Sequence, residues 1–417
     1  MLDVFSCGIG PIPKHIQQKV LLADHVFAAQ GLLSQLSAET GQKKSPVLHN
    51  ILPSPRDALR EAVALVSQGK NVCLLASGDA LYHGIGSTLA NMLDGMQKDK
   101  ADGEKLTIRF HPGLTAFQVL CHKIGLPWEK ARLFSVHSGS ASLRPLLEAP
   151  FAIIYTGLPL TPSKLAQALC ALHPASKKRC CILAEKLGTA EEYITRCTLQ
   201  DVVTAKTGPT GILVLLPEGA VPMPLPLGLD DAAYAFENHC LTARQVRPLV
   251  LSCLRLPAFG ELWDLGAGSG SVSIEAAMLR PDLHVSAVER VPARCRNIEH
   301  NLASHCVSNV TLHEGDSLAL MASLPQPDRV FIGGGGKDLP ELLRLSLAAL
   351  NKEDPLACVV VSAITLETTA ILQQFKDGIL QEIMSVDIAV SAPIGSYTRL
   401  SPLNRIHIFV FTPKNNA

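Results

Sequence analysis

The chain has 417 residues, and its 37 lysines and arginines balance 37 aspartates and glutamates, so the formal net charge is zero. This balance, without a dense basic run, argues against a nucleic-acid-binding protein, and 47% hydrophobic against 18% charged residues excludes a disordered polyampholyte. The mean hydropathy is +0.23, yet the sequence contains no apolar run of the ~20 residues that a membrane helix needs. At about 150 residues per domain, we expect two or three domains.

Twelve cysteines are scattered along the chain and form no C-x-x-C pair, which argues against a zinc site or a disulfide framework. We therefore expect reduced thiols, no metal and a cytoplasmic protein. A signal peptide has a basic stretch before its apolar residues, and this N-terminus does not, so we expect no signal peptide. Residues 2–8 instead indicate a first strand.

Strands and helices alternate over the first 216 residues, and most strands end in a turn of small residues. An amphipathic helix is expected at 56–68, because Leu59, Val63 and Val66 fall on one face. Strands are expected at 4–6, 71–76, 106–110, 151–155, 179–183 and 211–216, and helices at 16–23 and 163–172. Ligands of open α/β sheets bind at the carboxyl ends of the strands, so these turns predict one cleft lined by backbone.

A seam follows at residues 217–228, which read PEGAVPMPLPLG. Four prolines without structural partners make a stiff, extended connector. We place a first domain at 1–216, a proline-rich linker at 217–229 and a second domain at 230–417.

The second domain opens with a glycine-rich turn between a strand at 261–265 and a helix at 272–279. A second strand at 284–288 ends in Glu289, which can accept hydrogen bonds from both hydroxyls of a ribose. Because Ser271 replaces the last glycine of G-x-G-x-x-G, the loop is similar to the S-adenosylmethionine (SAM) loop of Rossmann-like methyltransferases. A dehydrogenase and a purely structural turn stay open as alternatives.

A run of four glycines and a lysine follows the strand at 329–332, and Asp338 after the lysine excludes a phosphate-binding P-loop. Such a run could form a floor without side chains on which a flat macrocycle lies, or a flexible loop.

Several motifs of the first domain carry a family resemblance in combination: GIGPIP, LLASGDALYHGIGSTL, HPGLTAFQ, YTGLP and AEKLGTAEEY. In this order they resemble the tetrapyrrole methylase family. The resemblance implies an α/β fold of two subdomains and a SAM site. Its SAM contacts fall on Pro11, Ser77, Gly78, Asp79, Tyr82, Thr115, Ala116, Thr156 and Gly188.

The motifs WDLGAGSGSVSIEAA, EGDS, FIGGGG, VSAITLET and APIGSYTRL extend the resemblance to a fused family of cobalamin biosynthesis. Members join a tetrapyrrole methylase to a Rossmann-like SAM methyltransferase, which implies one SAM site per domain. The second set of contacts falls on Thr242, Gly266, Ala267, Gly268, Ser269, Gly270, Glu289, Asp316 and Ser317.

The resemblance implies methylation of a metal-free corrinoid, precorrin-6B, at C5 by the first domain and at C15 by the second, with loss of CO2 from the ring C acetate. Substrate contacts are expected at the glycine run and at cations for its carboxylates, although each cation also fits a surface or structural charge. These candidates are Gly333, Gly334, Gly335, Gly336, Arg244, Arg247, Lys337 and Arg399. The catalytic groups are not identified, and a homo-oligomer is expected. Another tetrapyrrole substrate, or a protein that binds SAM or a corrinoid without turnover, stays open.

Overall fold

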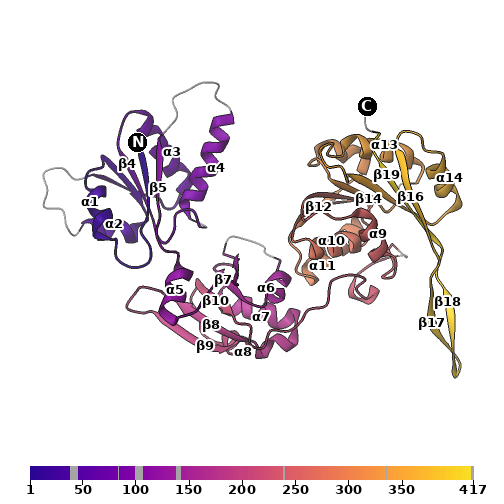
Figure 1. Cartoon of the computed structure of the whole chain (residues 1–417), viewed down its shortest axis with the longest axis horizontal. Coiled ribbons are helices and arrows are strands. Elements are labelled where there is room, and N and C mark those ends of the chain that lie inside the picture. The colour runs from indigo at the N-terminus through magenta and orange to yellow at the C-terminus, as the bar shows by residue number, and fades with distance from the viewer. Residues whose placement is uncertain are drawn as a thin grey trace. The chain divides into compact units, whose positions relative to one another are not determined.

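The computed structural model describes residues 1–37, 46–82, 84–98, 107–137, 142–237, 240–334 and 336–414. The chain forms two compact units (Figure 1). The first unit comprises Met1–Gly139 and Ala149–Ala220, and the second comprises Ser140–Glu148 and Val221–Ala417. The second unit thus includes a short helix, α6 (Arg144–Glu148), from the middle of the first half of the chain.

The first unit begins with a parallel sheet in the order β3-β2-β4-β1-β5. Its strands are β1 (Leu2–Ser6), β2 (His25–Ala28), β3 (Val47–Asn50), β4 (Val72–Ala76) and β5 (Ile108–His111). Helices α1 (Lys14–Val20) and α2 (Gln30–Ser37) pack on one face, and α3 (Pro55–Ser67) and α4 (Ile85–Lys98) on the other. All five residues of β4 are buried, as expected for a central strand covered on both sides.

A second, mixed sheet in the first unit has the order β6-β7-β10-β8-β9. It consists of β6 (Arg132–Ser135), β7 (Ala152–Thr156), β8 (Cys180–Glu185), β9 (Tyr193–Thr198) and β10 (Gly211–Leu215). Helix α5 (Ala116–Ile124) packs on one face through Phe117 and Leu120. Helices α7 (Pro162–Leu172) and α8 (Leu199–Thr204) contact β10 and β8. The predicted pair of α/β subdomains is confirmed.

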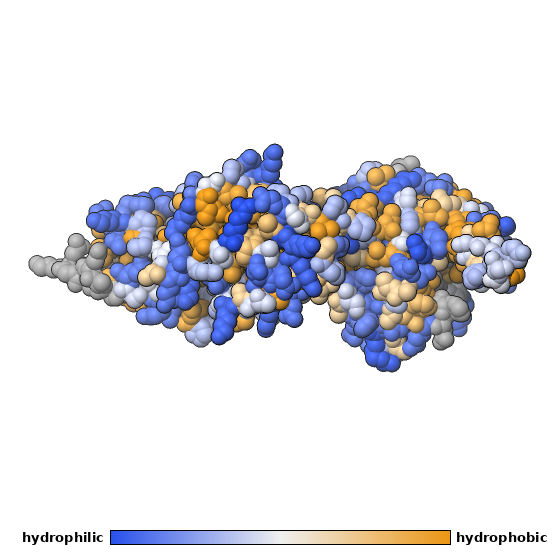
Figure 2. Space-filling model, turned by 90° about the horizontal axis from the view of Figure 1, so that it is seen from below, coloured by the Kyte–Doolittle hydropathy of each residue, from blue (hydrophilic) through white to orange (hydrophobic). Residues whose placement is uncertain are grey.

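Hydrophobic atoms reach the surface in patches bordered by hydrophilic ones (Figure 2). In the first unit, an open groove of this kind is lined by Ile124, Leu126, Ile182, Ile194, Arg196, Leu216, Pro217 and Glu218.

The second unit is built on a seven-stranded sheet in the order β13-β12-β11-β14-β15-β19-β16. The first five positions hold parallel strands: β11 (Phe259–Leu265), β12 (Asp282–Glu289), β13 (Val310–Glu314), β14 (Arg329–Ile332) and β15 (Cys358–Ala363). Strand β19 (Ile406–Thr412) runs antiparallel to both β15 and β16 (Ile379–Val386). The predicted Rossmann-like architecture is confirmed.

Helices cover both faces of this sheet. Helices α9 (Arg247–Leu254) and α10 (Ser271–Leu279) bury one face, and α13 (Leu339–Ala349) and α14 (Leu366–Gln374) bury the other. Chain order reverses between β11 and β14, so the crevice at their carboxyl ends is the expected ligand site of a doubly wound sheet. A hairpin of β17 (Ala389–Ile394) and β18 (Tyr397–Pro402) projects beyond the sheet (Figure 1).

None of the helices in the described ranges has the length and apolar character required to cross a membrane. In the same ranges, histidine, cysteine and acidic side chains do not gather in groups of three or more that could hold a metal ion.

Candidate functional site

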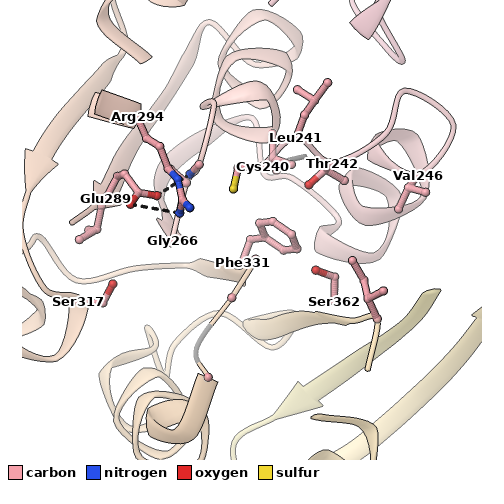
Figure 3. Close-up of a pocket in the computed structure, with 18 of the residues that line it drawn as sticks. Cys240, Leu241, Thr242, Val246, Gly266, Glu289, Arg294, Ser317, Phe331 and Ser362 are labelled. Carbon is pink, nitrogen blue, oxygen red and sulfur yellow. Dashed lines mark hydrogen bonds and ion pairs between the residues drawn. The ribbon is translucent and has the colours of Figure 1, made fainter. Parts of the chain in front are cut away.

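A cavity of about 620 Å³ opens at the switch point of the second unit, a size typical of small-molecule sites. Side chains from several loops converge on it, and the nearly buried ring of Phe331 forms part of its wall (Figure 3). Ten predicted residues line the cavity: Thr242, Gly266, Ala267, Gly268, Glu289, Asp316, Ser317, Gly333, Gly334 and Gly336.

The glycine loop after β11 packs tightly against its neighbours. Gly268 has a φ of +61°, and a Cβ atom there would lie 3.0 Å from the carbonyl oxygen of Cys240. A Cβ atom on Gly266 would lie 3.2 Å from the carbonyl oxygen of Gly334. Both contacts are backbone atoms, so a side chain would push the loop out of place. The loop therefore presents main-chain groups to the cavity.

Glu289 is 3% exposed at the end of β12, and backbone groups orient its carboxylate. The Gly268 amide donates to one carboxylate oxygen at 2.9 Å, and the amides of Arg290 and Val291 donate to the other at 3.0 and 2.9 Å. The guanidinium Nη1 of Arg294 lies 3.8 Å from Oε1 of Glu289. Figure 3 draws both side chains. A carboxylate has about four acceptor positions, so this one can still accept from a ligand hydroxyl.

Asp316 lies in the turn after β13 and is the N-cap of the short helix α12 (Ser317–Leu320). Its carboxylate accepts hydrogen bonds from the amides of Leu318 and Ala319 at 3.0 and 3.3 Å. These bonds fix the carboxylate at the edge of the cavity, next to Ser317.

The opposite end of the cavity is lined by residues that were not among those predicted from the sequence. There the wall is mostly apolar, with Ser362 and Asn404 as its polar side chains; the apolar members are Ile364, Val386, Ile388, Leu403 and Ile406. They come from β15, β16 and the chain on either side of β17 and β18, so no local motif links them. Among the described lining residues, the cations are Arg290 and Arg294, both beside Glu289.

The other predicted residues of the second unit that the structure describes lie outside the cavity lining. Ser269 is 2% exposed, and Gly270 precedes α10 as its N-cap. Lys337 lies in a short 3-10 turn (Gly336–Asp338), and Arg399 is exposed on β18. Gly335 lies outside the described residues.

The two predicted arginines at the start of this unit make internal ion pairs. Arg244 pairs at 3.4 Å with Asp230 on the surface. Arg247 is completely buried, and its guanidinium is used by Glu275, Asp231 and two main-chain carbonyls. The structure thus gives Arg247 a structural position instead of the predicted substrate contact.

In the first unit, the turns after the parallel strands β1, β4 and β5 meet, and the turn after β8 of the mixed sheet reaches the turn after β1. Gly8 and Gly78 exchange hydrogen bonds of 3.2 and 2.7 Å. A Cβ atom on Gly113 would lie 2.3 Å from the carbonyl oxygen of Ser6, and one on Gly188 would lie 2.5 Å from the side chain of Ile9. The predicted residues Gly78 and Gly188 therefore both contact the turn after β1, Gly78 at Gly8 and Gly188 at Ile9.

Helix α5 begins beside these turns, with Thr115 as its N-cap in a capping box with Gln118. The Phe117 amide donates to the hydroxyl of Tyr155 at 2.9 Å, and the ring of Tyr82 lies 5.5 Å from that of Tyr155. Burial, with a smaller effect of Tyr155, raises the pKa of Tyr82 to about 12, so its hydroxyl stays protonated.

The remaining predicted residues of this unit lie around the same turns. Asp79 accepts a hydrogen bond from the amide of Leu81 at 2.8 Å. The hydroxyl of Thr156 is turned toward β10, where it donates to the carbonyl of Gly211 at 2.9 Å. Pro11 and Ser77 are exposed, and Ala116 starts α5.

Together, the two folds and their glycine-lined strand ends define a chain of two methyltransferase domains. Two family models match: "Tetrapyrrole (Corrin/Porphyrin) Methylases" over residues 16–203 and "Precorrin methyltransferase domain" over residues 233–413. A precorrin-6Y C(5,15)-methyltransferase [decarboxylating] from a Sinorhizobium species is 32% identical over 85% of this chain and 82% of its own length. The chain belongs to the family of precorrin-6Y C(5,15)-methyltransferases (decarboxylating).

Shorter relatives match part of the chain. A probable cobalt-precorrin-6B C(15)-methyltransferase (decarboxylating) from Pyrobaculum aerophilum is 37% identical over 43% of this chain and 92% of its own length. A crystal structure of precorrin-6Y C5,15-methyltransferase from Geobacter metallireducens is 34% identical, with a TM-score of 0.42; the match covers 46% of this chain and all of that one.

Proposed function

We propose that this protein transfers two methyl groups from SAM to a precorrin, at C5 and C15, and removes the carboxyl group of the ring C acetate in cobalamin biosynthesis. The observation that carries the proposal is the cavity of the second unit, which joins a polar, glycine-lined end to an apolar end. The family of the chain supports the substrate.

The polar end fits SAM. Glu289 is held by three backbone amides and can accept hydrogen bonds from ribose hydroxyls, and Asp316 lines the same end of the cavity with a carboxylate that can accept from an adenine amine. The backbone of Gly266 and Gly268 lets the donor approach closely. SAM supplies a methyl group on a sulfonium, ready for in-line displacement by a nucleophilic carbon.

The protein contributes position and exclusion of water to the methyl transfer. Reaction requires that the meso carbon of the macrocycle lie in line with the methyl–sulfur bond, which is an effect of orientation rather than of a strong base. Gly333 and Gly334 leave space beside the donor for a flat ring, because neither carries a side chain.

The apolar end suits the decarboxylation. An ionised acetate among Ile364, Ile388 and Leu403 loses its hydration without gaining a cation, because the cations of the described lining lie beside Glu289. In the transition state the same negative charge is spread over the conjugated imines of the macrocycle. The apolar side chains therefore destabilise the localised charge of the acetate more than they destabilise the transition state, which lowers the barrier. The carbon–carbon bond breaks, its electron pair enters the macrocycle, CO2 leaves, and the macrocycle is then protonated.

We assign C15 methylation and decarboxylation to the second unit and C5 methylation to the first, with one SAM site in each. The short relative named for C15 methylation with decarboxylation supports a division of this kind, because 43% of this chain matches nearly all of it. The model named for precorrin methyltransferases covers residues 233–413, within the second unit.

The proposal includes a cytoplasmic location and a homo-oligomer. All twelve cysteines are free thiols, which suits a reducing compartment. On the β17–β18 hairpin, Ile394, Tyr397 and Leu400 are more than half exposed, which favours burial in an assembly. Light scattering of the purified protein measures the assembly, and a monomer at micromolar concentration would contradict it.

Mass spectrometry of a reaction with SAM and precorrin-6B tests the proposed function. We expect a product with two additional methyl groups and one CO2 lost. One methyl group without CO2 loss would contradict the role of the second unit. An unchanged substrate despite SAM binding would favour another tetrapyrrole or a non-catalytic binding protein.

A further inference from the structure

The segment that leads into α9 forms one side of the cavity in the second unit. We call residues 228–242 the donor strap, of which residues 238–239 lie outside the described ranges. The described part of the strap includes the 3-10 turn Asp231–Ala233. Its last residues, Cys240, Leu241 and Thr242, line the cavity (Figure 3). The carbonyl oxygen of Cys240 is the atom that a Cβ on Gly268 would approach to 3.0 Å. The donor strap therefore lies directly on the glycine loop.

A buried ion pair holds both ends of the donor strap. Arg247 on α9 and Glu275 on α10 are each 0% exposed and are joined at 2.7 Å. Arg247 also donates to the carbonyls of Leu229, near the start of the strap, and Thr242, at its end. Glu275 accepts hydrogen bonds from the amides of Gly228 and Leu229 at 2.8 and 2.9 Å.

A second buried side chain joins the middle of the donor strap to the glycine loop. Asn301 on α11 (Pro292–Ser304) is 0% exposed, and its amide group donates at 2.9 Å to the carbonyls of both Ala235 and Ser269. Its oxygen accepts from the amide of Ala235 at 2.7 Å. One carboxamide thus fixes the strap and the donor loop relative to each other.

The chemistry of these side chains points to positioning. A buried ion pair contributes little net stability compared with a well-packed apolar pair, because both charges lose their hydration. The rigid fork of an arginine, in contrast, holds several acceptors at fixed directions. Here the acceptors include the carbonyl of Thr242, whose residue lines the cavity.

We propose that Arg247, Glu275 and Asn301 are positioning residues that set the affinity of the second unit for the methyl donor by holding the donor strap against the glycine loop. This inference rests on the proposed function, in that the donor is SAM. If the donor strap is already ordered in the free protein, binding of the donor does not carry the entropy cost of ordering it, and the affinity is higher.

The test compares two buried arginines of the same unit. Arg329 is 2% exposed and also pairs with a carboxylate, that of Asp354, but it lies at the amino end of β14 and does not line the cavity. Calorimetric titration of the full-length protein with S-adenosylhomocysteine (SAH) measures the donor sites, and the component that Glu289→Ala weakens is assigned to the second unit. Thermal unfolding of each variant measures its loss of stability.

We expect Arg247→Met to weaken that component at least tenfold, and Arg329→Met to leave it within twofold at a comparable loss of thermal stability. Arg247→Lys should fall between, because a lysine keeps the charge but cannot reach all four partners. If Arg247→Met does not fold, Asn301→Asp serves instead: it keeps the acceptor for the Ala235 amide and repels the carbonyls of Ala235 and Ser269.

Equal SAH affinities of Arg247→Met and Arg329→Met, or of Asn301→Asp and the unchanged protein, would overturn the role of the donor strap and leave the proposed function intact. Absence of SAH binding in the unchanged protein would overturn the proposed function, and the strap proposal with it.

Discussion

Asp264 is a buried carboxyl group near the end of β11, one residue before the strand ends. It is 1% exposed, and one carboxylate oxygen accepts a hydrogen bond from the hydroxyl of Ser273 at 2.5 Å. Burial, with a smaller contribution from the charge of Glu289, raises its pKa from 3.8 to about 6, although hydrogen bonds from Ser273 act in the opposite direction. The folded protein therefore binds this proton more tightly than the unfolded chain does.

The stability that depends on this proton is greatest at low pH. It is fully present below about 3.8, falls as the pH rises through the raised pKa of about 6, and is absent above it. At neutral pH the ionised carboxyl group destabilises the second unit by about 3 kcal/mol, given 1.36 kcal/mol per pKa unit.

We predict that Asp264→Asn raises the melting temperature at pH 8 and changes it less at pH 5, because the asparagine keeps an acceptor for Ser273 and carries no charge. Thermal unfolding of the full-length protein at several pH values measures the difference between variant and parent. Asp354 provides the control: burial opposes ionisation, but hydrogen bonds from Arg329 and a backbone amide lower its pKa. Asp354→Asn should destabilise the protein at pH 8. A pH-independent effect of Asp264→Asn would contradict the role of its ionisation.

At the scale of elements, the turn between β5 and α5 depends on a very close approach to β1. A Cβ on Gly113 would lie 2.3 Å from the Ser6 carbonyl oxygen and 2.8 Å from its Cβ, so the turn must move. The hydroxyl of Ser6 also accepts from the Ala80 amide at 2.9 Å, which links this turn to the one after β4.

We predict that Gly113→Ala reduces SAH binding in the first unit at least tenfold and leaves the second unit unchanged. Titration of the full-length protein should then show one tight site instead of two. Gly125→Ala is the control, because a Cβ there meets nothing within 4 Å, although its φ of +63° adds backbone strain at the end of α5. Two unchanged sites in Gly113→Ala would place the donor site of the first unit elsewhere.

Some strands that are buried on both faces were predictable from the sequence, whereas the buried strands β2 and β19 were missed. The strand expected at 329–332 is β14 (Arg329–Ile332), and that at 71–76 is β4 (Val72–Ala76), because continuous burial leaves a continuous apolar run. Strands β16, β17 and β18 are largely exposed, so no apolar pattern marks them, and they were missed.

The candidate site divides in the same way. The polar end was found because its glycine loop and Glu289 follow two strands in a fixed local order. The apolar end combines Ser362, Val386 and Asn404 from distant parts of the chain, and their meeting depends on the order of the strands. The position of Arg247 was equally hidden, since its partner Glu275 is 28 residues away on another helix.

For the whole molecule, each unit has its own sheets, core and candidate donor site. The two reactions should therefore be separable by single substitutions. Glu289→Ala removes one or two charge-assisted hydrogen bonds to the donor, worth about 1.5–3 kcal/mol, which corresponds to a roughly tenfold to hundredfold weaker SAM site in the second unit. Gly113→Ala acts on the first unit alone.

We predict opposite products from these two variants at limiting SAM. Glu289→Ala should yield a corrinoid with one added methyl group and its ring C acetate intact, because methylation at C15 and decarboxylation share the cavity of the second unit. Gly113→Ala should yield one methyl group together with the loss of CO2. Mass spectrometry distinguishes the two products directly, and adding the variants together should restore the doubly methylated, decarboxylated product. Loss of CO2 in Glu289→Ala at the parent rate would show that decarboxylation does not depend on the donor site of the second unit.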